Sequence, residues 1–321
     1  MDDAISLPKP PPRLDAQKFR DPLVTAKGEI RAHVALKELR TLWINTGTLC
    51  NLTCAHCYIE SSPSNDRLAY ITAAEVADYF DEIAQQNLGT REIGFTGGEP
   101  FLNPDIIAMI KDALARGFQV LVLTNAMKPM MNRKRGLLAL RQKYGDRLTI
   151  RVSLDHYEPV LHELERGPKT FQRTLDGLRW LAQNGFRVHV AARTAWDESV
   201  DELRRGFGRL FEDTGIAIDS RDPQALVLFP EMDAGADVPE ITENCWNILH
   251  VNPDDLMCAH SRMVVKRKDA ARPSVLACTL IAYDPRFELG TTLKEAAGAV
   301  SLNHPHCARF CVLGGASCSH P

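Results

Sequence analysis

A repeated alternation of short apolar runs with amphipathic segments limits the folds open to this chain of 321 residues. Between the apolar runs, the apolar side chains recur every three or four residues, which indicates helices. Strands that alternate with helices predict a parallel sheet, wound by right-handed crossovers into a barrel or part of one. We therefore expect an α/β fold with a partial (β/α)6 TIM-like barrel. The predicted strands are residues 42–44, 92–96, 119–123, 148–154, 187–193 and 225–229.

The same pattern divides the chain into three predicted parts. Residues 1–40 are an N-terminal extension, in which a run of prolines excludes regular helix and favours a path along the surface. Residues 41–235 hold the barrel core. Residues 236–321 are rich in cysteine and predict a small α+β extension.

Composition excludes several classes of protein. There are 38 Lys and Arg against 41 Asp and Glu, so the net charge of −3 gives no basis for a nucleic-acid partner. No apolar run approaches the ~20 residues that span a bilayer. The acidic, proline-rich beginning of the sequence lacks the features of a signal peptide. We expect a cytoplasmic protein without a membrane partner.

The nine cysteines are unevenly distributed. Three lie at 50–57, none at 58–244, and six at 245–318. Clustered cysteines in a reducing compartment indicate metal binding or catalysis rather than disulfides. The sequence therefore predicts two separate metal-binding regions.

The first region reads Cys50-Asn-Leu-Thr-Cys54-Ala-His-Cys57. Three thiolates this close can converge on one centre, and a [4Fe–4S] cluster with only three local ligands leaves one iron open to a small molecule. Zinc with a Cys₃His set that includes His56 is the alternative. Against zinc, His56 is adjacent to Cys57, and neighbouring residues rarely reach one ion together.

Polar residues and glycines follow several of the predicted strands. In parallel βα folds the chemistry lies at the carboxyl ends of the strands, so these residues are predicted to share one site. Glycines let a ligand approach the backbone, and a carboxylate such as that of Glu99 accepts hydrogen bonds from an ammonium group. Turns and helix caps explain the same residues without any ligand. These candidate residues are Gly97, Gly98, Glu99, Asn125, Asp155 and Arg193.

Together these motifs resemble the radical S-adenosylmethionine (SAM) superfamily over roughly residues 41–235. The Cys-x₃-Cys-x₂-Cys spacing after a first strand is the family's signature, although His56 stands where an aromatic residue is usual. Gly97, Gly98 and Glu99 match the family's GGEP motif for the methionine amino group, and Thr124-Asn125-Ala126 departs from the family's TNG at its last residue. The resemblance implies that SAM is also contacted by Tyr58, Asn125, Ser153, Asp155 and Arg193.

The resemblance implies an enzyme with SAM and a [4Fe–4S] cluster as cofactors. Reductive cleavage of SAM would give a 5′-deoxyadenosyl radical that abstracts hydrogen from an organic substrate, with electrons from a flavodoxin- or ferredoxin-type reductant. Two alternatives stay open, an aminocarboxypropyl transferase and a non-catalytic metal- or SAM-binding protein. Tyr157, His156 and Cys245 are candidates for quenching the radical.

The second cysteine region resembles the SPASM or twitch extension of the same superfamily. A hairpin lies between two of its cysteines, and a cysteine cluster follows later. With fewer cysteines than a full SPASM domain, it implies one auxiliary [4Fe–4S] cluster; a structural zinc site is the alternative. Cys245 is expected to be free or to face the substrate, and the nearby His304, His306 and His320 are expected to be solvated. The implied ligands are Cys258, Cys278, Cys307 and either Cys311 or Cys318.

The resemblance leaves the substrate open between a small molecule and a peptide. Family members that modify peptides often carry a leader-binding module before the barrel. Residues 1–40 are too short and too rich in proline for such a module. We therefore expect a small molecule or a peptide supplied with a separate partner.

Overall fold

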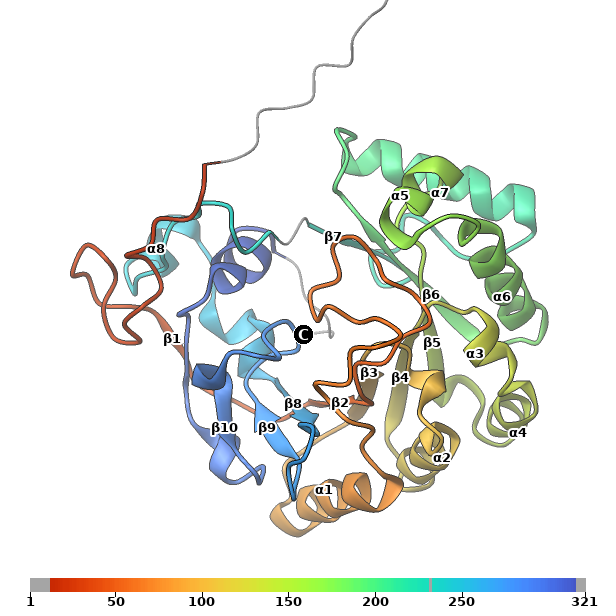
Figure 1. The fold of residues 1–321 in the computed structure, drawn as a ribbon, viewed down its shortest axis with the longest axis horizontal. Helices are drawn as coiled ribbons and strands as arrows, with labels where there is room; N and C mark the ends of the chain where they lie inside the picture. The colour runs from red at the N-terminus through yellow and green to blue at the C-terminus, as the bar shows by residue number, and fades with distance from the viewer. Residues whose placement is uncertain (1–11, 231–232, 316–321) are drawn as a thin grey trace, which may run out of the picture.

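A nine-stranded sheet organises the protein, whose computed structural model describes residues 12–230 and 233–315 (Figure 1). Its strand order is β10-β9-β8-β2-β3-β4-β5-β6-β7, and β1 pairs with β11 in a separate ribbon. The strands are β1 (His33–Val34), β2 (Thr41–Asn45), β3 (Glu92–Thr96), β4 (Gln119–Thr124), β5 (Leu148–Ser153), β6 (Arg187–Arg193), β7 (Leu226–Phe229), β8 (Ser261–Val265), β9 (Ser274–Leu276), β10 (Glu288–Gly290) and β11 (Val300–Ser301).

The strands from β8 through β2 to β7 are all parallel, and the sheet stays open rather than closing into a barrel. All six predicted strands are present, with ends that differ by at most a few residues. The expected α/β fold with a partial barrel is therefore confirmed.

Helices cover the outer face of the parallel strands (Figure 1). The short helices α3, α5 and α8 had not been expected from the sequence pattern. The helices are α1 (Ala73–Gln86), α2 (Ile106–Ala115), α3 (Lys128–Met131), α4 (Lys134–Tyr144), α5 (Pro159–Arg166), α6 (Phe171–Gln183), α7 (Val200–Thr214) and α8 (Cys245–Leu249).

Local sequence fixes where the longer helices begin and end. Thr72 and Ser199 each cap a helix through a reciprocal capping box with a glutamate three residues later. Gly215, in the left-handed conformation, ends α7. Such caps satisfy backbone groups at the helix ends, so the boundaries follow from a few residues.

Strand residues alternate between two apolar layers. Residues such as Ile44 and Val122 face the helices within the largest core cluster. Their neighbours Trp43 and Leu121 face the inside of the partial barrel, in a smaller cluster that includes Met263 and Leu276 of the C-terminal hairpin. The two-residue period of the strands thus separates the outer core from the inner one.

The C-terminal region continues the barrel sheet instead of forming a sheet of its own. Strand β8 pairs in parallel with β2, and β9 then pairs antiparallel with β8. The N-terminal residues also pack on this region, through β1 against β11 and a bridge between Arg31 and Thr242. The expected α+β extension therefore shares its sheet with the barrel, and the three-part division stays a prediction.

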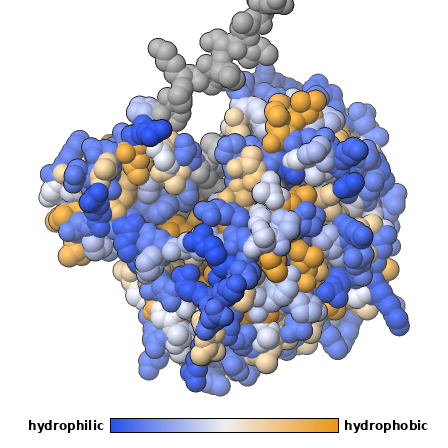
Figure 2. All heavy atoms as spheres, in the orientation of Figure 1, coloured by the Kyte–Doolittle hydropathy of each residue, from blue (hydrophilic) through white to orange (hydrophobic). Residues whose placement is uncertain are grey.

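The surface is largely hydrophilic on the face that Figure 2 shows, with apolar side chains in small separate groups. One such group lies over α5, where Val160 and Leu164 are 72% and 66% exposed. No helix among residues 12–230 and 233–315 is long and apolar enough to cross a bilayer.

Candidate active site

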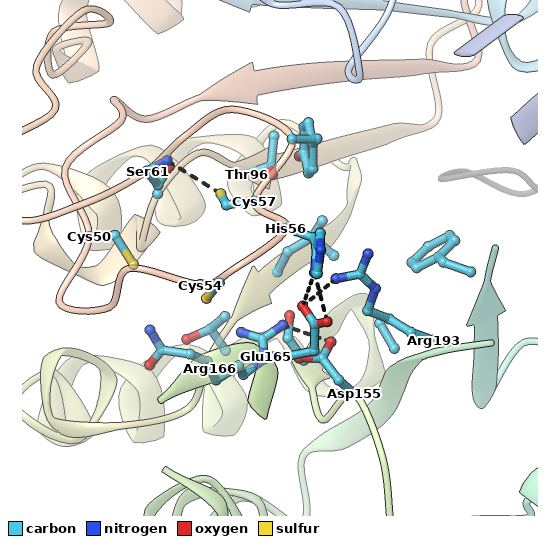
Figure 3. Close-up of a pocket in the computed structure, with 18 of the residues that line it drawn as sticks. Cys50, Cys54, His56, Cys57, Ser61, Thr96, Asp155, Glu165, Arg166 and Arg193 are labelled. Atoms are coloured by element: carbon cyan, nitrogen blue, oxygen red, sulfur yellow. Dashed lines mark hydrogen bonds and ion pairs between the residues drawn. The ribbon is translucent and has the colours of Figure 1, made fainter. Parts of the chain in front are cut away.

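A cavity of about 190 Å³ opens at the carboxyl ends of the parallel strands. The loop after β2 supplies the three clustered cysteines, and side chains from β3 to β6 supply the opposite wall (Figure 3). Seven of the eight other predicted contact residues also line it, namely Tyr58, Gly97, Gly98, Asn125, Ser153, Asp155 and Arg193. Folding thus brings together residues that the sequence placed at separate strand ends, while their roles in binding stay predictions.

The three thiols of the loop lie in partly or fully buried surroundings. Backbone amides donate to two of the sulfur atoms, Leu52 N to Cys50 Sγ at 3.4 Å and Ser61 N to Cys57 Sγ at 3.3 Å. Burial raises the pKa of Cys50 to about 12 and also raises the pKa of Cys54. Because a metal binds the thiolate, loading this site releases protons.

Gly97 and Gly98 shape the site by letting the cysteine loop approach the end of β3. A Cβ on Gly98 would lie 2.2 Å from the carbonyl oxygen of Leu49, and one on Gly97 would lie 2.6 Å from that of Gly47. Both glycines also line the cavity. The two glycines were expected to make room for a ligand. They also make room for the backbone of the cysteine loop.

Glu99 is buried and is absent from the lining of the cavity, although Gly98 and Asn125 beside it are part of that lining; its expected contact with SAM stays a prediction. Its carboxylate accepts hydrogen bonds from Thr124 Oγ1 at 2.8 Å, Asn125 N at 2.9 Å and Phe101 N at 3.2 Å. Burial raises its pKa to about 7, although these donors oppose the change. Glu99 therefore holds the ends of β3 and β4 together, and Asn125 beside it faces the cavity.

Asp155 forms a buried ion pair with Arg166, at the carboxyl end of α5. Arg166 Nε and Nη2 donate to the two carboxylate oxygens at 2.5 and 3.1 Å. Burial lowers the pKa of Arg166, but the charges of Asp155 and Cys54 outweigh it and raise that pKa. In return, the guanidinium opposes the effect of burial on the pKa of Cys54. A fixed positive charge thus lies beside the cysteine loop and favours its thiolate form.

A second charged group joins the cysteine loop to β6. Glu165 accepts from Arg193 Nη1 at 2.8 Å, and His56 Nδ1 lies 2.8 Å from Glu165 Oε1. Figure 3 shows the three side chains in contact at the edge of the cavity. The His56 ring is directed to this carboxylate through Nδ1.

Several residues of the cavity were not predicted as site residues. Glu165 and Arg166 belong to helix α5, which the sequence pattern did not predict. Arg151 lines the cavity from β5, two residues before Ser153, so strand alternation places both on one face and could have identified it. Phe310 belongs to the distant C-terminal region, whose position no local signal reveals.

The suggested radical-quenching residues lie outside the cavity lining. His156 and Tyr157 both bond to Glu198, at 2.5 Å in each case. Cys245 lies at the start of α8, where its sulfur is 3.4 Å from Thr242 Oγ1, and it lines neither cysteine cavity. Within the described residues, none of these three side chains lines the cavity.

A second, smaller cavity collects four of the C-terminal cysteines. Cys258, Cys278, Cys307 and Cys311 all line it, among apolar side chains. Burial raises the pKa of Cys258 to about 11 and raises the pKa of Cys307 well above its ordinary value. The choice between Cys311 and Cys318 stays a prediction, because Cys318 lies outside the described residues.

A π-helix, Cys307–Val312, places two of these thiols on one side. Cys307 and Cys311 are about one turn apart in it, and π-helical turns are frequent at functional sites. His306 also lines the cavity and is buried, and burial lowers its pKa to about 4. Burial likewise lowers the pKa of His304 to about 3. The expectation of a solvated side chain was wrong for His306, whereas His304 is half-buried; His320 lies outside the described residues.

The chain belongs to the radical SAM superfamily, whose family model matches residues 44–204. This match covers half of the chain and contains the whole cysteine loop and strands β3 to β6. Family members use SAM and a [4Fe–4S] cluster. The donor set fits both: three thiols share a cavity with backbone and polar side chains, and four further thiols share a second cavity.

Two curated relatives and one solved structure show how far the similarity extends. The subtilosin biosynthesis protein AlbA of Bacillus subtilis is 33% identical over 143 residues, 44% of this chain and 30% of the relative. The AdoMet-dependent heme synthase of Methanosarcina barkeri is 29% identical over 161 residues, 49% of this chain and 43% of the relative. The chain thus aligns with less than half of either relative.

The structural similarity extends into the C-terminal region. Streptococcus suis SuiB bound to S-adenosylmethionine superposes with a TM-score of 0.56, covering 78% of this chain and 62% of that chain. At 13% identity this likeness shows a shared fold.

Proposed function

We propose that the protein is a radical SAM enzyme that uses SAM to generate a carbon radical on an organic substrate. The observation that carries this proposal is the convergence of Cys50, Cys54 and Cys57 with Gly97 and Gly98 at one cavity. When bound, the cluster and SAM supply a 5′-deoxyadenosyl radical that abstracts hydrogen from the substrate. The remaining steps depend on side chains of this chain.

In this proposal different walls of the cavity contact different parts of SAM. The backbone of Gly97 and Gly98 lies beside the cysteine loop, where the amino acid end of SAM would bind. Asn125, Ser153 and Arg193 offer polar contacts from three further strands. Tyr58 and the aromatic rings that line the cavity reduce access of water, which protects a radical from side reactions.

We also propose that the second cavity holds an auxiliary [4Fe–4S] cluster. Its four lining cysteines would leave no iron open, which favours electron transfer over direct binding of substrate. Leu280 lines both cavities, so an apolar side chain would lie between the two centres. Such proximity supports short-range electron transfer after the hydrogen abstraction. A flavodoxin- or ferredoxin-type protein would supply the first electron.

For the substrate, we propose a peptide. The relative AlbA belongs to the biosynthesis of an antilisterial bacteriocin. The exposed Val160 and Leu164 of α5 would give an extended chain an apolar contact close to the cavity, because Glu165 and Arg166 of that helix line the cavity. A small metabolite is the competing class, since another relative is a heme synthase.

Product analysis tests the central proposal. Anaerobically reconstituted protein with SAM and a strong reductant is expected to form 5′-deoxyadenosine, and Cys54→Ala is expected to abolish it. Methylthioadenosine would instead indicate aminocarboxypropyl transfer. Intact SAM after incubation of iron-replete protein, with and without candidate peptides, would favour the non-catalytic alternative.

A further inference from the structure

A six-residue segment, residues 278–283, connects the two cysteine cavities. At one end Cys278 lines the second cavity, and in the middle Leu280 lines both. At the other end the Tyr283 hydroxyl donates a 2.8 Å hydrogen bond to the carbonyl oxygen of Ile59, two residues after Cys57. The segment thus runs directly from one set of cysteines to the loop that carries the other.

Side chains of the segment that follows Cys57 surround the Tyr283 ring. The Arg67 guanidinium lies 3.5 Å from the centre of the ring and pairs with Glu60 at 3.1 Å. The Asn65 amide lies 3.4 Å from the Tyr283 hydroxyl. Ile59 is buried in the same apolar cluster that Tyr283 packs against. Tyr283 therefore contacts the part of the cysteine loop that returns from Cys57, through polar and apolar contacts together.

The chain segment that follows the cysteine loop also forms hydrogen bonds with the C-terminal hairpin. Ala69 N donates to Lys266 O at 2.7 Å, and Lys268 N donates to Arg67 O at 3.0 Å. This hairpin lies between Cys258 and Cys278 in the sequence. Both ends of the loop therefore depend on the C-terminal region, since β2 before the loop pairs with β8.

We propose that Tyr283 is a positioning residue that couples the two metal centres. A metal held by Cys278 would restrain residues 278–283 further, and the Tyr283 hydrogen bond would transmit this restraint to the cysteine loop. By thermodynamic reciprocity, loading of the first site also favours the second. This inference rests on the proposed metal content of both cavities.

The first test needs no metal. Hydrogen exchange of the metal-free protein is measured on peptides within residues 50–68, for wild type and for Tyr283→Phe. Loss of one hydrogen bond is expected to speed exchange about fivefold in these peptides. The control is Tyr144→Phe, because the Tyr144 hydroxyl has no partner within the described structure. Unchanged exchange in Tyr283→Phe would overturn the positioning role, and unchanged exchange in α6 shows that the variant is folded.

The second test is a double-mutant cycle on the reconstituted protein. Iron release to a chelator is followed at the first centre, identified as the one whose EPR signal changes on addition of SAM. Cys278→Ser and Tyr283→Phe are each expected to speed this release about fivefold, and the double variant is expected to be little faster than Cys278→Ser. Additive effects, or no effect of Cys278→Ser, would overturn the coupling alone. A wild-type protein that binds no iron would overturn the proposed function and the coupling with it.

Discussion

Replacing Asp155 with alanine would leave the Arg166 guanidinium without its carboxylate beside the cysteine loop. Side-chain exposure is 7% for Asp155 and 16% for Arg166, so water would replace the lost contacts poorly. The pair makes two charge-assisted hydrogen bonds, at 2.5 and 3.1 Å. Removal of one partner therefore leaves a buried charge uncompensated.

The loss of stability can be calculated from the two hydrogen bonds and the burial of the pair. Each hydrogen bond to a charged group contributes about 1.5–3 kcal/mol, and breaking a buried ion pair from one side costs about 3–5 kcal/mol. We expect Asp155→Ala to lower the free energy of unfolding of the metal-free protein by about 3–5 kcal/mol. The neutral variant Arg166→Gln in the Asp155→Ala background should restore part of this loss, because it removes the unpaired charge.

Denaturant titration of the metal-free protein, followed by circular dichroism, measures this free energy. The matched control is Asp146→Ala, which breaks an ion pair with Arg141 at 3.3 Å whose aspartate side chain is 77% exposed. Exposed pairs contribute about 0–1 kcal/mol. Equal losses in Asp155→Ala and Asp146→Ala would refute the reasoning, as would a double variant no more stable than Asp155→Ala.

Three further predictions follow from the same structure. Glu99→Gln should remove a pH dependence of stability, because the folded-state pKa of Glu99, about 7, lies above the ordinary value of 4.5. The free energy of unfolding of the wild type should therefore fall by on the order of 3 kcal/mol as the pH rises from 4.5 to 7, and that of the variant should not. Unfolding titrations across this pH range measure the difference. Gly98→Ala should reduce iron bound at the first centre severalfold, because its Cβ would lie 2.2 Å from a backbone oxygen of the cysteine loop, whereas Gly298→Ala, with open space around it, should bind iron as wild type does. Metal analysis should find about four fewer irons in Cys278→Ala and unchanged iron in Cys245→Ala; equal iron in both variants would contradict the assignment of the second cavity.

Local pattern was sufficient for the barrel strands and for the first cysteine loop. Apolar runs and helix spacing reflect burial of one face, which acts within a few residues, and the capping box at Thr72 is equally local. The spacing of Cys50, Cys54 and Cys57 fixes three thiols on one loop whatever surrounds it. Because parallel strands bring their carboxyl ends to one edge, Asn125 and Asp155 could also be assigned to one site.

Helix α5 could not be identified in this way. It has eight residues and two exposed apolar side chains, Val160 and Leu164, so its periodicity does not mark a buried face. Glu165 and Arg166 acquire their roles only because the helix end lies against Asp155 and Arg193. The hydrogen bonds of Glu99 show the same limit, since no local pattern indicated that its carboxylate accepts from Thr124 and Asn125.

The sequence by itself determined the parallel βα pattern, the three-cysteine loop and the existence of a second cysteine region. The resemblance implied a shared site for the distant cysteines, but only the tertiary structure decided that β8 adds to β2 and that Tyr283 contacts the cysteine loop. The physical reason is distance along the chain. Patterning records which side of an element is buried, whereas pairing between distant segments depends on shape and hydrogen bonding that no short stretch of sequence contains.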